Sequence, residues 1–205
     1  MSAVLLSSTY FGPVQWYQKL HRTETCYIEK FDSFIKQTFR NRCIIATSSG
    51  TQVLTVPVER TTETPGAMVT MKDVRISDHG NWCHLHWNAL CSAYGDSPFF
   101  EYYADDLRPF FEQRWERLYD YNMALTQKMC ELLDIQPRLL PTEYYQHESD
   151  MPDFREVIRP KHPLADPDFQ PHPYYQVFAC RHGFQPNLSI LDLLFNMGPE
   201  SVFFL

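Results

Sequence analysis

Proline distribution divides the 205-residue chain more sharply than any other feature of its sequence. Eight of its 15 prolines fall within residues 136–173. Proline lacks the backbone N–H that helices and central strands need, and it biases the preceding residue toward extended backbone. We therefore expect residues 136–173 to be mostly extended or looped. A loop of this length inside a compact domain is unusual and often functional.

Strand and helix signals alternate in the first thirty residues. Residues 3–9 form an apolar, β-prone run, Pro13 suits the first position of a helix over 13–22, and a second β-prone run covers 25–29. A strand, a helix and a strand within this length have the size of a βαβ unit, in which the two strands are parallel.

Two further strands, at 41–47 and 52–58, flank the turn residues 48–50 and predict a hairpin. Pro57 places the second strand at a sheet edge or ends it, because proline cannot donate to a strand ladder. A short strand is also expected at 73–76. Residues 1–76 are therefore predicted to be mainly sheet.

Residues 77–205 carry mainly helical patterns outside the Pro-rich segment. Asn81 is expected to cap a helix that runs to about Tyr94. Further helices are expected from Ser97, with a restart at Pro109, and over 114–133.

The last expected helix begins at Ser189, which forms a capping box with Asp192, and it ends at Gly198. The patterns together predict one domain over residues 1–205. Its class is mixed α/β: a small N-terminal sheet with a βαβ unit, followed by a helical half packed on it.

Composition limits the class of protein. With 44% apolar and 15% aromatic residues the chain can form a core, yet no apolar run exceeds four residues, so we expect no membrane span. The net charge of −7 disfavours a broad nucleic-acid surface. Six cysteines without metal-site spacing, and a start without signal-peptide features, predict reduced, buried thiols and a cytoplasmic protein.

Several chemical classes are excluded by missing motifs. The seven glycines are each more than ten residues apart, so neither a dinucleotide fingerprint nor a phosphate-binding P-loop can be written. No serine nucleophile elbow or zinc helix is present. His84 and His86 would lie about 200° apart on a helix and cannot share an ion. We expect no metal and no cofactor.

His86 is the strongest candidate for acid–base chemistry, because it falls on the inward face of the helix that follows Asn81. It is either a core histidine or a general base with its pKa shifted by burial. Arg40 and Arg42 would share one face of a strand and could clamp a carboxylate or phosphate, whereas Asn41 would take the other face. The alternative is a solvated edge with paired acids.

Further candidates surround the strand ends. Tyr10, Gln15 and Trp16 follow the first strand, where ligands bind in open α/β sheets, and Gln15 would lie near helical N–H groups that attract anions. The alternative is that these aromatics pack the sheet edge. Gln37 precedes the third strand. Gln176 follows two tyrosines that either line a pocket or fill the core.

Carboxylate pairs are less informative. Asp105 with Asp106, and Asp166 with Asp168, are expected in solvated positions, and Asp192 is explained by capping its own helix.

Several blocks, in order along nearly the whole chain, resemble the WbqC-like protein family, in its shorter, Bacteroides-type form. They are Tyr10-Phe-Gly-Pro13, Gln37-Thr-Phe-Arg-Asn-Arg42, Leu54-Thr-Val-Pro-Val58, Trp82 to Tyr94, Pro98-Phe-Phe and Pro186 to Pro199. The positions that match the motifs are Tyr10, Pro13, Asn41, Arg42, Pro57, His86, Tyr94, Gln176, Ser189, Asp192, Asn196 and Gly198. Longer members carry a Ser/Gly-containing segment where this chain has residues 136–173.

The resemblance implies a role in O-antigen or other surface-polysaccharide biosynthesis, with glycine (amino-acid) transfer to a sugar as the suggested activity. On that hypothesis His86 is the base, Arg42 holds a carboxylate or phosphate, and Asn41 and Gln15 donate to developing negative charge. The hypothesis requires Tyr10, Gln15, Asn41, Arg42 and His86 to line one cavity. The substrate would be a sugar or an amino-acid-derived small molecule, and the oligomeric state is open.

Two other classes remain. A Rossmann-like nucleotidyl transferase would share the strand, proline turn and helix at 5–20, although Gln15, Trp16 and Tyr17 stand where its histidines are expected. A non-catalytic accessory protein of envelope assembly would instead display an exposed aromatic patch, for which the tyrosine-rich stretches are candidates: Tyr102, Tyr103, Tyr119, Tyr121, Tyr144 and Tyr145.

Overall fold

The computed structural model describes residues 2–59 and 68–205. Strands β1 (Ala3–Ser7) and β2 (Thr25–Glu29) are parallel neighbours, and helix α1 (Val14–Arg22) connects them. The expected βαβ unit is therefore confirmed. Ala3 is opposite Thr25 and Ser7 opposite Glu29, so both strands end at the same edge of the sheet.

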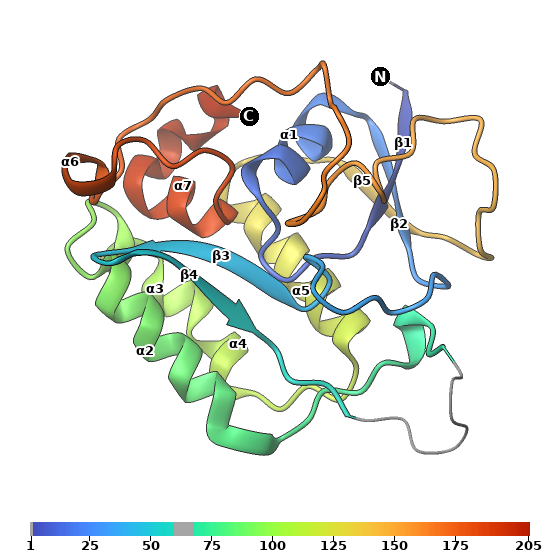
Figure 1. The fold of residues 1–205 in the computed structure, drawn as a ribbon, viewed down its shortest axis with the longest axis horizontal. Helices are drawn as coiled ribbons and strands as arrows, with labels where there is room; N and C mark the ends of the chain where they lie inside the picture. Colours follow the sequence, from blue (N-terminus) through green and yellow to red (C-terminus); the bar gives the residue numbers. More distant parts are fainter. Residues whose placement is uncertain (1, 60–67) are drawn as a thin grey trace.

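The third strand of this sheet comes from the Pro-rich segment. Strand β5 (Arg138–Pro141) runs parallel to β2 and gives the order β1-β2-β5 (Figure 1). On the opposite edge, Leu5 of β1 exchanges backbone hydrogen bonds of 2.9 Å with Pro152 and Phe154. We expected this segment to be mostly extended or looped, and two of its extended stretches flank the parallel sheet on both edges.

A separate antiparallel ribbon consists of β3 (Arg42–Thr47) and β4 (Gly50–Thr55), which confirms the predicted hairpin. β4 ends before Pro57, as expected. The strand predicted at 73–76 is wrong. A 3₁₀ turn, η1 (Met71–Asp73), takes up the first residue of this stretch, and Arg75 and Ile76 make only isolated bridges.

The second half is helical, as predicted. Asn81 precedes the first long helix but does not cap it with its side chain: its backbone is left-handed, with φ of 46°. The helix expected over 114–133 begins only at Leu118. The helices are α2 (Trp82–Tyr94), α3 (Phe100–Leu107), α4 (Pro109–Glu112), α5 (Leu118–Leu132), α6 (Ala179–His182) and α7 (Ile190–Met197), with 3₁₀ turns η2 (His79–Asn81) and η3 (Gly198–Phe204).

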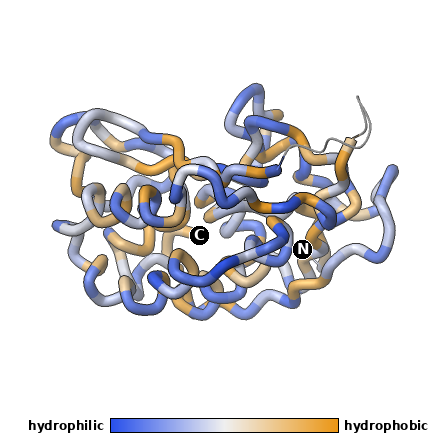
Figure 2. Tube along the Cα trace, turned by 90° about the horizontal axis from the view of Figure 1, so that it is seen from below, coloured by the Kyte–Doolittle hydropathy of each residue, from blue (hydrophilic) through white to orange (hydrophobic). Residues whose placement is uncertain are grey.

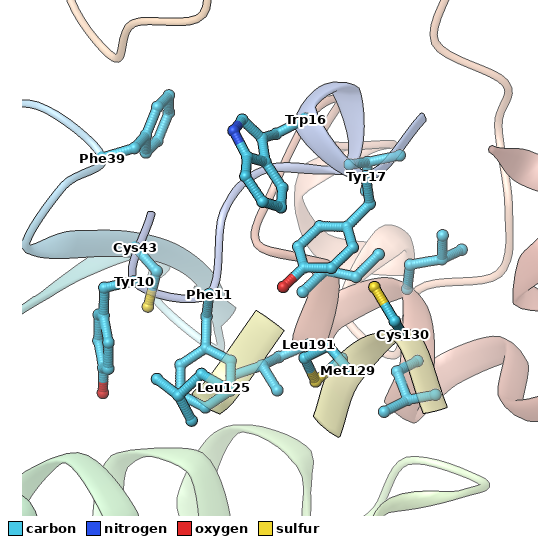
Figure 3. Packing of buried hydrophobic residues seen from close by; sticks show 14 of the residues in the cluster. Tyr10, Phe11, Trp16, Tyr17, Phe39, Cys43, Leu125, Met129, Cys130 and Leu191 are labelled. Carbon is cyan, nitrogen blue, oxygen red and sulfur yellow. The ribbon is translucent and has the colours of Figure 1, made fainter. Parts of the chain in front are cut away.

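The β3–β4 ribbon lies between the green helices α2 to α4 and the red α7, and one aromatic-rich core joins these layers (Figure 1). Figure 3 shows Tyr17 of α1 extending toward Met129 and Cys130 of α5. Tyr10 and Phe11, between β1 and α1, are fully buried. The loop that leaves β1 is therefore part of the core.

Hydrophobic residues follow one another only in short runs along the trace (Figure 2). Within residues 2–59 and 68–205, no helix is both long enough and apolar enough to cross a bilayer. All six cysteines are unpaired, and they differ in exposure: Cys26, Cys43 and Cys130 are buried, whereas Cys180 is exposed. The prediction that every thiol is buried is wrong for Cys180.

Candidate functional site: a charged cavity at the carboxyl ends of the parallel strands

The carboxyl ends of β1 and β2 bring polar residues together beneath the Pro-rich segment. Ser7 ends β1, Glu29 ends β2, and Thr142 follows β5. Register partners in a parallel ladder point to the same face, so Ser7 and Glu29 lie side by side. Ligands of open α/β sheets bind at this edge, which makes it the first place to look for a site.

Glu29 is fully buried, and its carboxylate accepts hydrogen bonds from four donors. Its Oε1 accepts from Thr142 Oγ1 (2.7 Å) and Phe31 N (2.9 Å), and its Oε2 accepts from Arg155 Nη1 and Gln146 N, both at 3.2 Å. This carboxylate therefore fixes the start of the Pro-rich segment to the end of β2.

Arg155 reaches Glu29 from within the Pro-rich segment. Its guanidinium also binds Asp153, with Nη2 at 2.7 Å from Oδ2, and donates to the carbonyl of Gln146 at 2.7 Å. The ring of Tyr145 lies 5.1 Å from the guanidinium carbon. Arg155 is thus held rigidly, with its side chain only 8% exposed.

Asp32 and Arg40 form a second buried ion pair beside the first. Arg40 Nε lies 3.1 Å from Asp32 Oδ2, and one terminal guanidinium nitrogen binds the same oxygen. The backbone carbonyl of Arg40 accepts from Asn122 Nδ2 at 2.8 Å, which ties the pair to α5. Burial raises the pKa of Asp32, and Glu29 adds to the rise although Arg40 and Arg155 oppose it.

The Asp32–Arg40 pair and Arg155 with Asp153 line a cavity of about 210 Å³, here called the charged cavity. Asp32 Oδ1 is buried and has no hydrogen-bond partner among the described residues, and the same holds for Ser7 Oγ at the end of β1. A buried polar atom without a partner carries a free-energy cost that a bound ligand or water would remove. The cavity is lined by Asp32, Ser33, Ile35, Arg40, Tyr145, Asp153, Arg155 and Glu156.

His86, the predicted base, lies elsewhere, inside the aromatic core. Its Nδ1 is 2.8 Å from Tyr10 OH, and its ring packs edge-on against Trp82. Burial lowers the pKa of His86 to about 4, although a hydrogen bond with the backbone of Thr55 opposes this shift. The imidazole is therefore neutral near pH 7 and enclosed by rings.

Asn41 and Arg42 lie at the start of the β3–β4 ribbon. Asn41 Nδ2 donates to the carbonyl of Val56 at 2.9 Å, and its Oδ1 is buried without a partner in the described chain. β3 begins at Arg42, so Arg40 precedes the strand and the expected shared face does not exist. The second guanidinium beside Arg40 is that of Arg155.

Gln15 and Trp16 are fixed by local contacts. Gln15 Nε2 donates to Asp166 Oδ2 at 2.8 Å, and Trp16 Nε1 donates to the carbonyl of Ser7 at 3.0 Å. We expected free N–H groups at the start of α1 that could bind an anion, but the first of these groups are bonded within the chain. Val14 N donates to the carbonyl of Leu188 and Gln15 N to Asn187 Oδ1, both at 2.9 Å.

Asp166, expected in solvent, is buried instead, with its side chain 4% exposed. Lys19 Nζ lies 2.7 Å from its Oδ2, and burial of the carboxyl is outweighed by its bonds to Lys19 and Gln15, which lower its pKa. Gln37 is exposed and accepts from Lys161 Nζ at 2.7 Å. These contacts fix the far end of the Pro-rich segment.

Gln176 belongs to a network around Asp192. Its Nε2 donates to Asp192 Oδ2 at 2.8 Å, and Tyr94 and Tyr174 donate to the same carboxyl. Ser189 caps α7 by accepting from Leu191 N, as expected. The capping role assigned to Asp192 is wrong, because its carboxyl binds these side chains instead.

The predicted residues thus occupy separate networks. Arg40 lines the charged cavity, whereas Tyr10, Gln15, Asn41, Arg42 and His86 do not. The residues that sequence reasoning missed are Asp32, Glu29 and Arg155. Glu29 ends strand β2 and Asp32 follows it, at the ligand-binding edge, which is a usable signal, whereas nothing in the local sequence marks Arg155.

Comparison with known proteins agrees with the order of motifs. Residues 8–159 and 165–203 match the WbqC-like protein family. The chain belongs to this family. The matched ranges cover the positions of Asp32, Arg40 and Arg155 and most of the Pro-rich segment, of which only residues 160–164 fall outside the match.

A Mycobacterium tuberculosis relative of this WbqC-like protein, named "Uncharacterized protein Rv1507c", is 29% identical over 192 residues. The alignment covers 82% of this chain and 81% of the relative. No solved structure shows a significant match.

Proposed function

We propose that this protein is a transferase of surface-polysaccharide biosynthesis that moves an amino-acid-derived acyl group, glycyl in the simplest case, onto a sugar. The observation that carries the proposal is the charged cavity. Its volume of about 210 Å³ suits a ligand of amino-acid size and lies below the roughly 300 Å³ of larger small-molecule sites. It also offers groups of both signs.

Asp32, Arg40 and Arg155 each have a role in such a transfer. Asp32 Oδ1, which has no partner in the described chain, is free to accept from the ammonium of an aminoacyl donor. Arg40 and Arg155 are then placed to stabilise the negative charge that develops on the acyl oxygen. The acceptor nitrogen or oxygen bonds to the acyl carbon, the donor's ester or thioester bond breaks, and the leaving group takes the acceptor's proton.

His86, Arg42 and Asn41 define the competing centre for the same reaction, and one experiment separates the two. The probe is glycinamide, which has an ammonium and a neutral acyl group, and N-acetylglycinamide is its control without the ammonium. We expect calorimetry to detect glycinamide only, with at least tenfold weaker binding in Asp32→Asn and unchanged binding in His86→Gln.

Other outcomes assign the site differently. Loss of binding in His86→Gln, with Asp32→Asn unaffected, would move the centre to the aromatic core. Absence of glycinamide binding in the wild-type protein would contradict an amino-acid-derived donor. Stabilisation by a nucleotide with magnesium would favour nucleotidyl transfer, although the N–H groups at the start of α1 are already bonded.

A further inference from the structure

The outer edge of β4 has the properties of an interface and lies away from the charged cavity. β4 (Gly50–Thr55, sequence GTQVLT) is the last strand of a two-stranded sheet, and Thr51, Gln52 and Val53 are exposed. Natural proteins protect such edges with charges, prolines or bulges. The strand contains neither a charged residue nor a proline.

The pairing of the ribbon shows which backbone groups point outward. Thr47 and Gly50 flank a two-residue turn, so they exchange hydrogen bonds, and every second pair along the ladder does the same. The residues between direct their N–H and C=O groups away from the ribbon. On β3 these groups are used: Ala46 N donates to Tyr94 OH and Ile44 O accepts from Ser189 N.

On β4 the same alternation turns the backbone of Thr51 and Val53 toward the open edge. No backbone hydrogen bond from another segment of the described chain reaches either residue. The Val53 side chain is 48% exposed, although valine is ordinarily buried. The edge therefore presents backbone donors and acceptors together with an apolar side chain.

Beside this edge lies a hollow of about 570 Å³ between the hairpin and α2. Its ten lining residues include no ionisable side chain; Gln52 and Leu85 are among them, and Leu85 is 59% exposed. The chain carries a net charge of −7, so two copies repel each other overall. The hollow beside β4 has no ionisable lining residue and adds nothing to this repulsion.

We infer that β4 pairs antiparallel with β4 of a second copy of this chain, which joins the two ribbons into a four-stranded sheet. With the two-fold axis at Gln52, Thr51 of each copy lies opposite Val53 of the other. Both residues direct their backbone groups outward, so each pair exchanges its N–H···O bonds. An isologous contact of this kind is self-complementary and closes as a dimer.

The two-fold axis gives a charge-swap test. Gln52 of one copy faces Gln52 of the other, so Gln52→Lys and Gln52→Glu each place like charges opposite one another. In sedimentation equilibrium the wild-type chain forms a concentration-dependent dimer, and each variant alone associates at least tenfold more weakly. An equimolar mixture of the two variants regains a dimer, because lysine then faces glutamate.

The control is Tyr102→Lys, which adds a charge at an exposed position of α3 and leaves the dimer unchanged. Circular dichroism confirms that the variants are folded, and recovery on mixing excludes misfolding as the cause of dissociation. A wild-type chain that stays monomeric at every concentration overturns the inference. A dimer that survives in Gln52→Lys also overturns it, because the contact then lies elsewhere.

Discussion

Two buried aspartates, one in each half of the molecule, show how a structural carboxyl differs from a candidate functional one. Both Asp192 on α7 and Asp32 after β2 are buried, and burial raises the pKa of each. Asp192 Oδ1 accepts from Tyr94 OH at 2.9 Å, and its Oδ2 accepts from Tyr174 OH at 2.7 Å and from Gln176. Asp32 uses one oxygen for Arg40, and the other has no partner among the residues that the structure describes.

The pKa shift alone therefore does not identify a site, since the two carboxyls shift in the same direction for the same reason. The two carboxyls differ in whether both oxygens accept hydrogen bonds and in whether a cavity reaches them. Asp192 is surrounded by neutral donors and does not line the charged cavity; its carboxyl links α7 to Tyr94 of α2, Tyr174 and Gln176. Asp32 has a charged partner, an unused oxygen and a cavity in front of it.

The largest expected effect comes from breaking the charged pair. Arg40→Met leaves Asp32 buried without its counter-charge, and removing one partner of a buried ion pair typically costs about 3–5 kcal/mol of unfolding free energy. Urea denaturation measures this loss. The double variant Arg40→Met with Asp32→Leu should regain much of it, because no buried charge is left; a single variant within about 1 kcal/mol of wild type would contradict the pair's importance.

A second test uses His86, because burial lowers its pKa whereas burial raises the pKa of Asp32 and Asp192. Its folded pKa of about 4 lies below the usual 6.5, so the unfolded chain takes up this proton first as pH falls. Stability from His86 is complete above pH 6.5 and is lost between about 6.5 and 4, by up to roughly 3 kcal/mol.

The raised pKa values of Asp32 and Asp192 act against this loss, because their folded carboxyls bind protons before the unfolded ones do. Their contribution is complete below the unfolded pKa and declines as pH rises through the folded pKa. His86→Gln should therefore reduce the decline in the unfolding free energy between about pH 6.5 and 4. If its pH profile parallels that of wild type, His86 is not the titrating group.

Asp192→Asn should have a smaller effect, a loss of about 1–2 kcal/mol, because asparagine keeps one acceptor oxygen for the buried donors. The matched variant Asp32→Asn should weaken glycinamide binding at least tenfold, and it should also lose stability because Arg40 then stays buried without its counter-charge. Thermal unfolding and calorimetry on both variants check the contrast. Weaker ligand binding in Asp192→Asn with normal stability would reverse the assignment of the two carboxyls.

Local patterns predicted what short-range physics controls. The βαβ unit follows from strand and helix propensity within thirty residues, and the hairpin from Ser48, Ser49 and Gly50 between two apolar runs. Ser189 was recognisable as an N-cap because a cap depends only on its own turn. The family blocks likewise lie in order along the sequence.

The site could not be predicted in the same way, because its contacts join distant parts of the chain. Arg155 and Glu29 are 126 positions apart, and Lys19 and Asp166 are 147 apart. Proline content indicated a loop, yet it could not show that Arg138–Pro141 would pair with β2, since a short edge strand tolerates proline at its ends. Arg40 was found from its neighbours Asn41 and Arg42, and its true partner, Asp32, was not.

The smallest expected effect lies at the exposed end of the Pro-rich segment. Lys161 donates to Gln37 at 2.7 Å, but both residues are exposed, and such contacts are individually weak. Lys161→Ala should change the unfolding free energy by less than about 0.5 kcal/mol, as for most surface substitutions. The matched variant is Lys19→Met, which leaves the buried Asp166 side chain without its counter-charge. It should lower the unfolding free energy several times more. Urea denaturation of the two variants tests whether buried contacts stabilise this segment more than exposed ones. Equal losses of unfolding free energy would show that they do not.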